Sequence, residues 1–396
     1  MRGVRPVCAA VMVLALLASG CTTMTTAAQH LLPPIWMELT PAPDARDVSP
    51  ARLPMVRADL GRLTRVTLVG RHGAVVKGNL NPARTRWVAA RKLGYGKRYT
   101  LIARGVGQNG EPTVRRSTFT TVSPARRLSL TPALSDGVTV GVGMPISLQF
   151  SGPVRRKAVA ERAMRVTTSP RTEGGFHWFS DEWVVWRPKE YWRPGTEVTL
   201  EAEIYGRHLG NGSYGAFDVS RSMTIGRKLV AVASGKTHHM RVWINGRMVK
   251  RMPISMGKPT HPTPRGIYTV MSEHRGYTFD SSTYGVPITA PEGYRIRVTH
   301  ATRMSYSGIF YHSAPWSAGA QGNTNVSHGC LNLSTAHADW LMRHSKPGDL
   351  ITVTGSGGPR LDPTDGFSVW QLPWRKWRHQ RAKHHRINRP GRRRPS

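Results

Sequence analysis

The sequence predicts a mainly β protein built from several domains. Three observations support this prediction: the length of the chain, its many glycine and proline residues, and the alternation of polar with apolar residues. Its 396 residues exceed one ordinary domain, and the usual domain size suggests roughly two to four. The 40 glycines and 29 prolines favour short strands and turns over long helices. A hydrophobic content of 39% is compatible with folded cores. Short runs with period-two alternation recur along the chain and predict half-buried strands.

The first predicted module, residues 36–122, reads as a β-sandwich. Thr64–Val69 and Arg98–Ile102 alternate between polar and apolar residues, and Val106–Gly110 supplies a turn. Short strands at this spacing are typical of two packed sheets.

The second module, residues 123–226, repeats this pattern and includes one short predicted helix at Ala158–Met164. Neither module carries a cysteine pair or an acidic cluster suited to a metal, which favours a spacer or docking role. A carbohydrate-binding role through the tryptophans of the second module is the alternative, although alternating aromatic residues in a strand more often belong to a core. These tryptophans are Trp178, Trp183 and Trp186.

A third, mainly β unit is predicted for residues 227–355. Asn245-Gly246 separates two β-prone runs and predicts a hairpin with a type I′ turn. Ser334 is a candidate cap for a helix over Thr335–His344. Residues 356–377 form a tryptophan-containing segment that we expect to pack on this unit.

The N-terminus has the features of an export signal. Arg2 and Arg5 precede the apolar run Val7–Ala18, which is shorter than a membrane-spanning helix requires. Ser19, Gly20 and Cys21 follow, and the stretch is similar to a bacterial lipobox, although Ala18 stands where that pattern prefers leucine.

We therefore expect residues 1–21 to be a lipoprotein signal peptide, with Cys21 lipidated, and residues 22–35 to be a flexible tether. An ordinary signal peptide that is cleaved nearby is the alternative. The expected location is the outer face of the cytoplasmic membrane, from which the protein would reach into the cell wall.

Charge is the unusual feature of the composition. The formal net charge is +35 and the isoelectric point is near 11.4, which favours polyanionic partners. Residues 378–396 form a basic, low-complexity tail that we expect to be disordered. Because export is expected, anionic wall polymers or lipid headgroups are better partners for this tail than nucleic acid, and a solvated tail without a partner is the alternative.

The stretch from His312 to Asn332 carries the predicted chemistry. Cys8 and Cys21 lie in the leader, so Cys330 is the one thiol of the predicted folded part, and no disulfide is expected. His312 ends the strand-like run Ile309–His312, and an imidazole is the usual base for a thiol nucleophile. Gly329 permits a tight turn before the cysteine, whose neighbouring N–H groups would face an oxyanion.

Ser327-His328-Gly329-Cys330-Leu331-Asn332, preceded by His312-Ser313-Ala314-Pro315-Trp316, closely resembles the signature of the L,D-transpeptidase (YkuD-type) family. The match includes Thr263–Tyr268, Asp280–Pro287 and the later tryptophans. Together with the leader and two modules, it resembles the actinobacterial, mycobacterial-type lipoprotein members. The resemblance implies two tandem immunoglobulin-like β-sandwich domains before a β-rich catalytic domain with a short helix.

The resemblance also implies residue roles. Cys330 would be the nucleophile and His312 its base, oriented by the Ser313 carbonyl. The N–H groups of His328, Gly329 and Cys330 resemble an oxyanion site. Substrate contacts are expected from seven residues: Phe279, Tyr294, Ser307, Gly308, Trp316, Ser327 and Asn332. Phe279 is a departure from the pattern, because close relatives can carry methionine at this position.

The activity that the resemblance implies is the formation of 3→3 cross-links between peptidoglycan stem peptides, with release of D-Ala and acylation of Cys330 by carbapenems. No cofactor and no metal are expected, because we find no metal-ligand spacing among the histidines. Two alternatives stay open, namely a hydrolase that uses water as the acceptor and a non-catalytic wall-binding scaffold.

Overall fold

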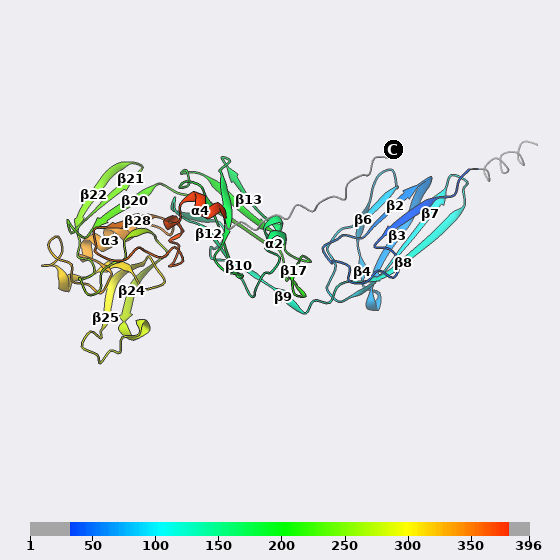
Figure 1. Cartoon of the computed structure of the whole chain (residues 1–396). Coiled ribbons are helices and arrows are strands. Elements are labelled where there is room, and N and C mark those ends of the chain that lie inside the picture. The colour runs from blue at the N-terminus through cyan, green and yellow to red at the C-terminus, as the bar shows by residue number, and fades with distance from the viewer. Residues whose placement is uncertain (1–31, 380–396) are drawn as a thin grey trace, which may run out of the picture. The chain divides into compact units, whose positions relative to one another are not determined.

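The computed structural model describes residues 32–379, so the predicted signal peptide, Cys21 and all but the first two residues of the basic tail lie outside the described residues. The chain divides into two compact units (Figure 1). Unit 1 comprises Met1–Arg126 with Tyr205–Arg207, and unit 2 comprises Arg127–Ile204 with His208–Ser396. Within residues 32–379, no helix has the length and apolar character needed to cross a bilayer.

Unit 1 contains two four-stranded sheets around one apolar core, which includes Val56, Leu68 and Leu101. The strands of each sheet pair antiparallel, and alternate residues of the long strand between Arg98 and Val106 are buried, as period-two alternation predicts. One sheet has the order β1 (Trp36–Thr40), β2 (Met55–Asp59), β6 (Arg86–Ala89), β5 (Gly78–Leu80), and the other β4 (Val75–Val76), β3 (Gly61–Gly70), β7 (Arg98–Gly107), β8 (Pro112–Thr120). The short turn η1 (Arg71–Gly73) joins β3 to β4.

Unit 2 begins with a second β-sandwich. Trp178 and Trp186 lie in its core, so they are structural rather than exposed platforms for sugars. Its two main sheets have the orders β10 (Leu130–Pro132), β12 (Ile146–Phe150), β15 (Trp183–Pro188), β14 (Gly174–Trp178) and β11 (Val138–Val140), β19 (Val219–Ile225), β16 (Glu197–Ala202), β13 (Met164–Ser169). The remaining elements are α2 (Lys157–Ala163) and a small sheet of β9 (Arg126–Leu128), β17 (His208–Gly210) and β18 (Ser213–Gly215).

The rest of unit 2 is a β-rich domain with a five-stranded and a four-stranded sheet. The expected hairpin forms at Asn245 and Gly246, whose φ angles of 49° and 86° match the predicted turn. The sheets have the orders β22 (Arg247–Pro253), β21 (His239–Ile244), β20 (Leu229–Ser234), β28 (Leu350–Thr354), β23 (Gly266–Thr269) and β24 (Ser272–Asp280), β25 (Arg295–Arg303), β26 (Phe310–Ser313), β27 (Leu331–Leu333).

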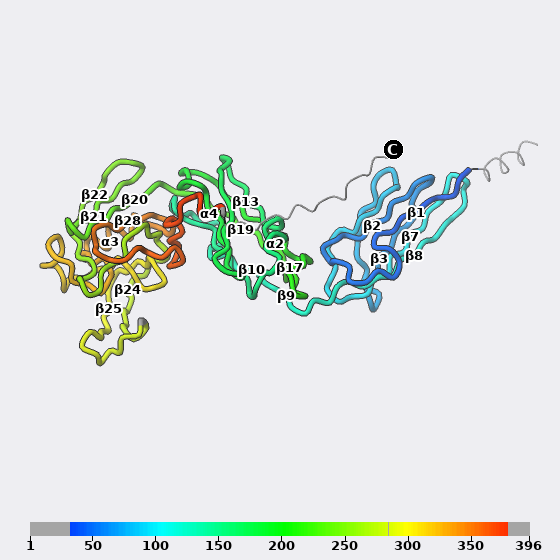
Figure 2. The backbone as a smooth tube through the Cα atoms, viewed as in Figure 1, coloured from blue at the N-terminus to red at the C-terminus, as the bar shows by residue number. Residues whose placement is uncertain are grey.

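Helix α3 (Thr335–His344) begins where the sequence predicts, because the Ser334 side chain accepts a hydrogen bond from the N–H of His337. The hairpin β24–β25 extends from the body of this domain, and its connection carries the short turn η2 (Ser281–Tyr284) (Figure 2). We call residues 281–294 the lid.

The second sandwich and this β-rich domain share a close backbone junction. The N–H groups of Gly141 and Gly143 donate to the carbonyls of Pro347 and Gly348, at 2.8 and 2.7 Å. A Cβ atom on Gly141 would lie 2.3 Å from the backbone nitrogen of Asp349, so glycine is required by the close approach. Leu350 of β28 also belongs to the sandwich core. The mainly β prediction is confirmed.

The C-terminal segment packs on two neighbours, the second sandwich and the β-rich domain. Its first part does contact that domain, through Leu361 in the core and through Gln371, which donates to the Ile267 carbonyl at 2.7 Å. Helix α4 (Trp374–His379) lies instead beside the second sandwich (Figure 1). The fully buried Trp377 stacks on His177 there.

Arg187 of the sandwich explains this docking. Its guanidinium lies 4.6 Å from the Trp370 ring and 4.5 Å from the Trp377 ring, and donates to the Leu372 carbonyl at 2.7 Å. Turn η3 (Pro315–Ser317) and turn η4 (Val369–Gln371) complete the described elements.

Candidate active site

His312 is held at the end of a buried strand, between two aromatic rings. Strand β26 pairs in parallel with β27, which places His312 opposite Asn332. The imidazole lies 4.8 Å from the Phe279 ring and 6.0 Å from the Trp316 ring. Its Nδ1 lies 3.0 Å from the Ser313 carbonyl oxygen, which can only accept a hydrogen bond. Nδ1 therefore carries the proton, and Nε2 is left as the basic atom.

The turn before Cys330 is fixed by hydroxyl groups. The Ser327 hydroxyl donates to the Cys330 carbonyl at 2.7 Å, and the Thr263 hydroxyl donates to the Gly329 carbonyl at 2.7 Å. Gly329 has a φ angle of 130°, and a Cβ there would lie 3.0 Å from Ile309. The glycine is required by this backbone conformation, as the sequence suggests.

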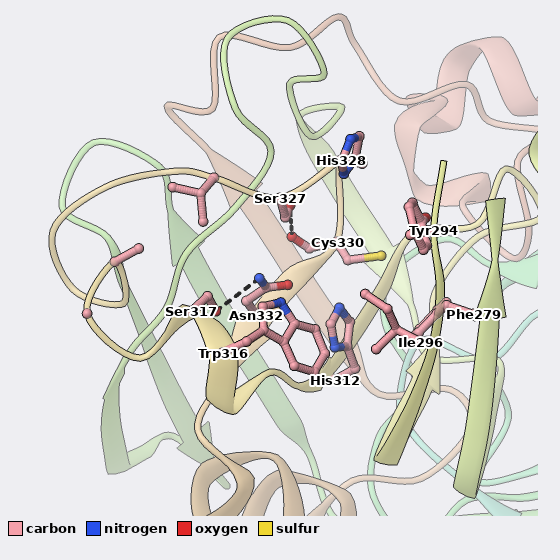
Figure 3. A pocket seen from close by; sticks show the side chains of 13 residues that line it. Phe279, Tyr294, Ile296, His312, Trp316, Ser317, Ser327, His328, Cys330 and Asn332 are labelled. Atoms are coloured by element: carbon pink, nitrogen blue, oxygen red, sulfur yellow. Dashed lines mark hydrogen bonds between the residues drawn. The ribbon is translucent and has the colours of Figure 1, made fainter. Parts of the chain in front are cut away.

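Cys330 and His312 open into the same cavity of about 480 Å³. Figure 3 shows the thiol and the imidazole on one side of it, with Tyr294, Ile296 and Phe279 opposite the cysteine and Trp316 beside the histidine. Of the predicted substrate contacts, Phe279, Tyr294, Trp316, Ser327 and Asn332 line this cavity, as do the lining residues that sequence reasoning missed: Ile296, Ser317, Gly319, Ala320 and Val326.

The remaining predicted residues lie around the cavity rather than in its lining. Ser313 contributes its carbonyl to His312, while its hydroxyl faces Thr299 at 3.0 Å. The Gly308 carbonyl accepts a hydrogen bond from the Cys330 thiol, with 3.5 Å between Sγ and the oxygen. Ser307 is turned away, because its hydroxyl and N–H both donate to Asp365 of the C-terminal segment, at 2.5 and 2.8 Å.

Burial keeps both reactive groups neutral. The pKa of His312 is lowered to about 4, mainly because the imidazole is buried, despite the hydrogen bond to Ser313. The pKa of the Cys330 thiol is raised to about 11 by burial, against a smaller lowering by the Phe310 backbone. Cys330 as a whole residue keeps partial exposure to solvent. At neutral pH the free site therefore holds a thiol beside an imidazole, not a thiolate beside an imidazolium.

This protonation state predicts the pH dependence of alkylation. Since the Cys330 pKa lies near 11, the thiolate fraction rises about tenfold per pH unit below that value. We expect the rate of iodoacetamide alkylation of Cys330, followed by mass spectrometry, to keep rising from pH 7 to pH 10. A rate that reaches a plateau below about pH 8 would instead reveal a preformed ion pair.

The oxyanion donors differ from those expected. Gly329 N–H donates to the Ser327 hydroxyl at 3.0 Å and is therefore already satisfied. Within residues 32–379, the N–H groups of His328 and Cys330 have no acceptor. Two of the three predicted donors thus remain available to a developing oxyanion.

A charged cluster at the cavity rim joins the lid to the cysteine turn. Glu292 of the lid lies 2.8 Å from Lys258 Nζ, 3.3 Å from His261 Nε2 and 3.6 Å from His328 Nε2. These contacts lower the Glu292 pKa, with Lys258 as the main cause. Sequence reasoning missed this cluster, because its four residues come from three separate segments.

Three residues of this cluster are close enough to bind a metal ion. The ligand atoms of His261, Glu292 and His328 lie within 4.8 Å of one another. Lys258 already supplies a cation to the carboxylate, so we treat the cluster as a clasp for the lid.

The clasp predicts a salt-sensitive effect on access to the cavity. Glu292 and Lys258 are partly exposed, so solvent and salt screen their attraction and the effect of breaking the pair is small. We expect Lys258→Met to slow acylation by imipenem by no more than about fivefold at low salt, and this difference should disappear near 1 M salt. Stopped-flow fluorescence would measure the rate, with Lys236→Met as the control. A salt-independent loss in Lys258→Met would contradict the clasp.

Comparison with known proteins agrees with this geometry. The L,D-transpeptidase catalytic domain family matches residues 228–353, and the bacterial Ig domain family matches residues 45–208. L,D-transpeptidase 2 of Mycobacterium tuberculosis is 45% identical over 328 residues, which cover 83% of this chain and 80% of the relative. The chain belongs to the L,D-transpeptidase family.

Two further members of this family support the assignment. L,D-transpeptidase 5 of Mycobacterium tuberculosis is 36% identical over 368 residues, covering 90% of this chain and 80% of the relative. The structure of LD transpeptidase LdtMt1 in complex with imipenem superposes with a TM-score of 0.50 at 35% identity, covering 58% of this chain and 100% of that one. The identified L,D-transpeptidase domain thus coincides with the part of the chain that holds Cys330 and His312.

Proposed function

We propose that this protein is a peptidoglycan L,D-transpeptidase that forms 3→3 cross-links through a thioester on Cys330. The observation that carries the proposal is the pairing of Cys330 with His312 in one cavity, with Nδ1 of the imidazole tied to the Ser313 carbonyl. Membership of the family and an imipenem-bound structure of a related enzyme support the same chemistry.

In the first step, Cys330 Sγ attacks the carbonyl between the diamino acid and the terminal D-Ala of a tetrapeptide stem. Because the thiol is neutral in the free site, its proton moves to His312 Nε2 as the carbon–sulfur bond forms. The carbonyl oxygen gains negative charge, which the N–H groups of His328 and Cys330 stabilise. His312 then gives its proton to the D-Ala nitrogen, the amide bond breaks, and a thioester remains.

In the second step, a side-chain amine of a neighbouring stem attacks the thioester. The amine passes a proton to His312 as the new amide bond forms. The carbon–sulfur bond then breaks, and His312 returns the proton to Sγ, which restores the Cys330 thiol. The Asn332 side-chain carbonyl is buried, lines the cavity and has no hydrogen-bond partner among the described residues. It is therefore placed to accept a hydrogen bond from a substrate N–H, while its amide nitrogen is held by Ser317 at 3.1 Å.

The masses of the products test this proposal. Purified protein is incubated with disaccharide tetrapeptide, and products are analysed by mass spectrometry. Dimers linked between two diamino acids, with one D-Ala released per link, are expected. Tripeptide without dimers would establish the hydrolase, and unchanged substrate with a folded protein would favour the scaffold.

We also propose that the mature protein is anchored by lipid on Cys21 at the outer face of the cytoplasmic membrane. The lipobox-like stretch supports this location, although it lies outside the described residues. The mass of the N-terminal peptide tests this anchor. A peptide that retains Cys21 without acyl groups, or that begins after Cys21, would contradict it.

A further inference from the structure

Unit 1 contains a groove of about 680 Å³ that has no role in the proposed reaction. Arg71, Arg91, Lys97 and Arg98 line it, together with His72. Asp47 supplies the one carboxylate of the lining, against four permanent cations. The size falls within the range of ligand sites in proteins.

The cations of this groove are exposed, and they are not used in the fold. In the described part of the chain, the side chains of Arg71, Arg91, Lys97 and Arg98 form no ion pair and no hydrogen bond, and only the backbone of Lys97 bonds to the Thr121 hydroxyl. They come from separate positions, namely turn η1, the loop before β7 and the start of β7. Several like charges held around one concave surface repel one another, and an anion that enters the groove relieves this repulsion.

The floor of the groove is less polar than its walls. Val76 and Tyr99 lie there with exposures of 5% and 8%. The Tyr99 ring stacks on Phe119 at 5.8 Å, and its hydroxyl accepts a hydrogen bond from Gly94 at 3.0 Å. The ring is almost buried and one face is covered by Phe119, so it offers little exposed face on which a nucleobase could stack, as binding of single-stranded nucleic acid would require.

We infer that this groove binds a linear anionic polysaccharide, whose carboxylate or phosphate groups pair with the four cations while sugar rings lie over the floor. Guanidinium groups match both carboxylate and phosphate through paired hydrogen bonds. The choice of a wall glycan over nucleic acid rests on the proposed function, which places the protein at the wall. Such binding would hold the enzyme near its substrate without any contact with Cys330.

A site-resolved experiment on the full chain tests this inference, because the basic tail also attracts polyanions. Lys97 serves as the reporter, and its protection from acetylation by bound glycan is measured by mass spectrometry. Lys236, an exposed lysine of unit 2, is the reference. The probes are an oligogalacturonate, a phosphorylated amylose fragment of equal charge, a neutral chito-oligosaccharide and a single-stranded oligonucleotide of equal charge.

Protection of Lys97 by either anionic glycan, and not by the neutral one, is expected, and the tighter of the two identifies the anionic group. Arg71→Gln with Arg91→Gln and Arg98→Gln should raise the half-protecting concentration at least tenfold. The charge-matched set Arg65→Gln, Arg115→Gln and Arg116→Gln lies on exposed positions of unit 1 outside the groove and should change it less than about threefold. If the triple variant does not fold, Arg91→Gln alone is tested instead. It should raise the half-protecting concentration by an intermediate factor.

Equal losses in both triple variants, an unprotected Lys97, or equal protection by the oligonucleotide would overturn the inference. Acylation of Cys330 is measured on the same preparations. If Cys330 is acylated normally but no glycan binds the groove, only this inference is refuted. If glycan binds the groove but Cys330 is not acylated, only the proposed function is refuted.

Discussion

Replacing Cys330 by alanine is expected to abolish the formation of cross-linked dimers. Loss of a catalytic nucleophile removes the covalent route altogether, and such losses cost on the order of 10⁴-fold or more in rate. Dimer formation from disaccharide tetrapeptide, measured by mass spectrometry, should fall below detection. The carbonyl of residue 330, which accepts from Ser327, is retained, so the turn should keep its shape.

Cys330→Ser is the matched control for this experiment, because it restores a side chain of similar size with a much weaker nucleophile. It should be folded, with a melting temperature close to that of the wild type, and should form at most traces of dimer. Dimers formed by Cys330→Ala at more than about a hundredth of the wild-type rate would show that another group carries the reaction.

Replacing His312 by glutamine is expected to have the second largest effect. The substitution removes the proton acceptor, and general-base contributions are typically about 10²–10⁴-fold. The rate constant for acylation of Cys330 by imipenem should fall within this range at pH 7. The measurement is the growth of the adduct in intact mass spectra.

The pH profile separates a chemical role of His312 from a structural one. If His312 acts as the base, the variant should recover part of its rate at pH 10, where the thiolate fraction is larger. A variant that reacts at the wild-type rate at pH 7 would exclude His312 as the base. A loss that stays constant from pH 7 to pH 10 would indicate misplaced geometry instead.

Local features of the site could be predicted from the sequence because short-range rules decide them. Gly329 reads as a turn residue and adopts a φ angle of 130°, and Ser334 reads as a helix cap and accepts from His337. His312 ends a run of apolar residues and lies at the end of β26. Each depends on neighbours along the chain, which are visible in the sequence.

Features that depend on contacts between distant segments could not be predicted. Glu292 meets Lys258, His261 and His328 only when the lid folds over the cysteine turn. The hydrogen bond from the Gly329 N–H to the Ser327 hydroxyl likewise depends on the folded shape of the turn, which sequence patterns do not report.

The same limit applies to the C-terminal segment. Asp365 takes Ser307 away from the cavity, and the sandwich residue Arg187 binds the late tryptophans. No residue periodicity reports such pairings. The cationic groove of unit 1 was likewise hidden, since strongly basic composition alone does not show which cations gather around one surface.

The central claim is that a thioester on Cys330 forms when D-Ala leaves. The most direct measurement is the intact mass of the protein, quenched in acid soon after mixing with a tetrapeptide donor and without an acceptor. We predict a gain equal to the donor minus D-Ala, located on Cys330 by peptide mapping and removed by hydroxylamine. An unmodified protein in a reaction that still releases D-Ala, or an acyl group on any other residue, would contradict the account.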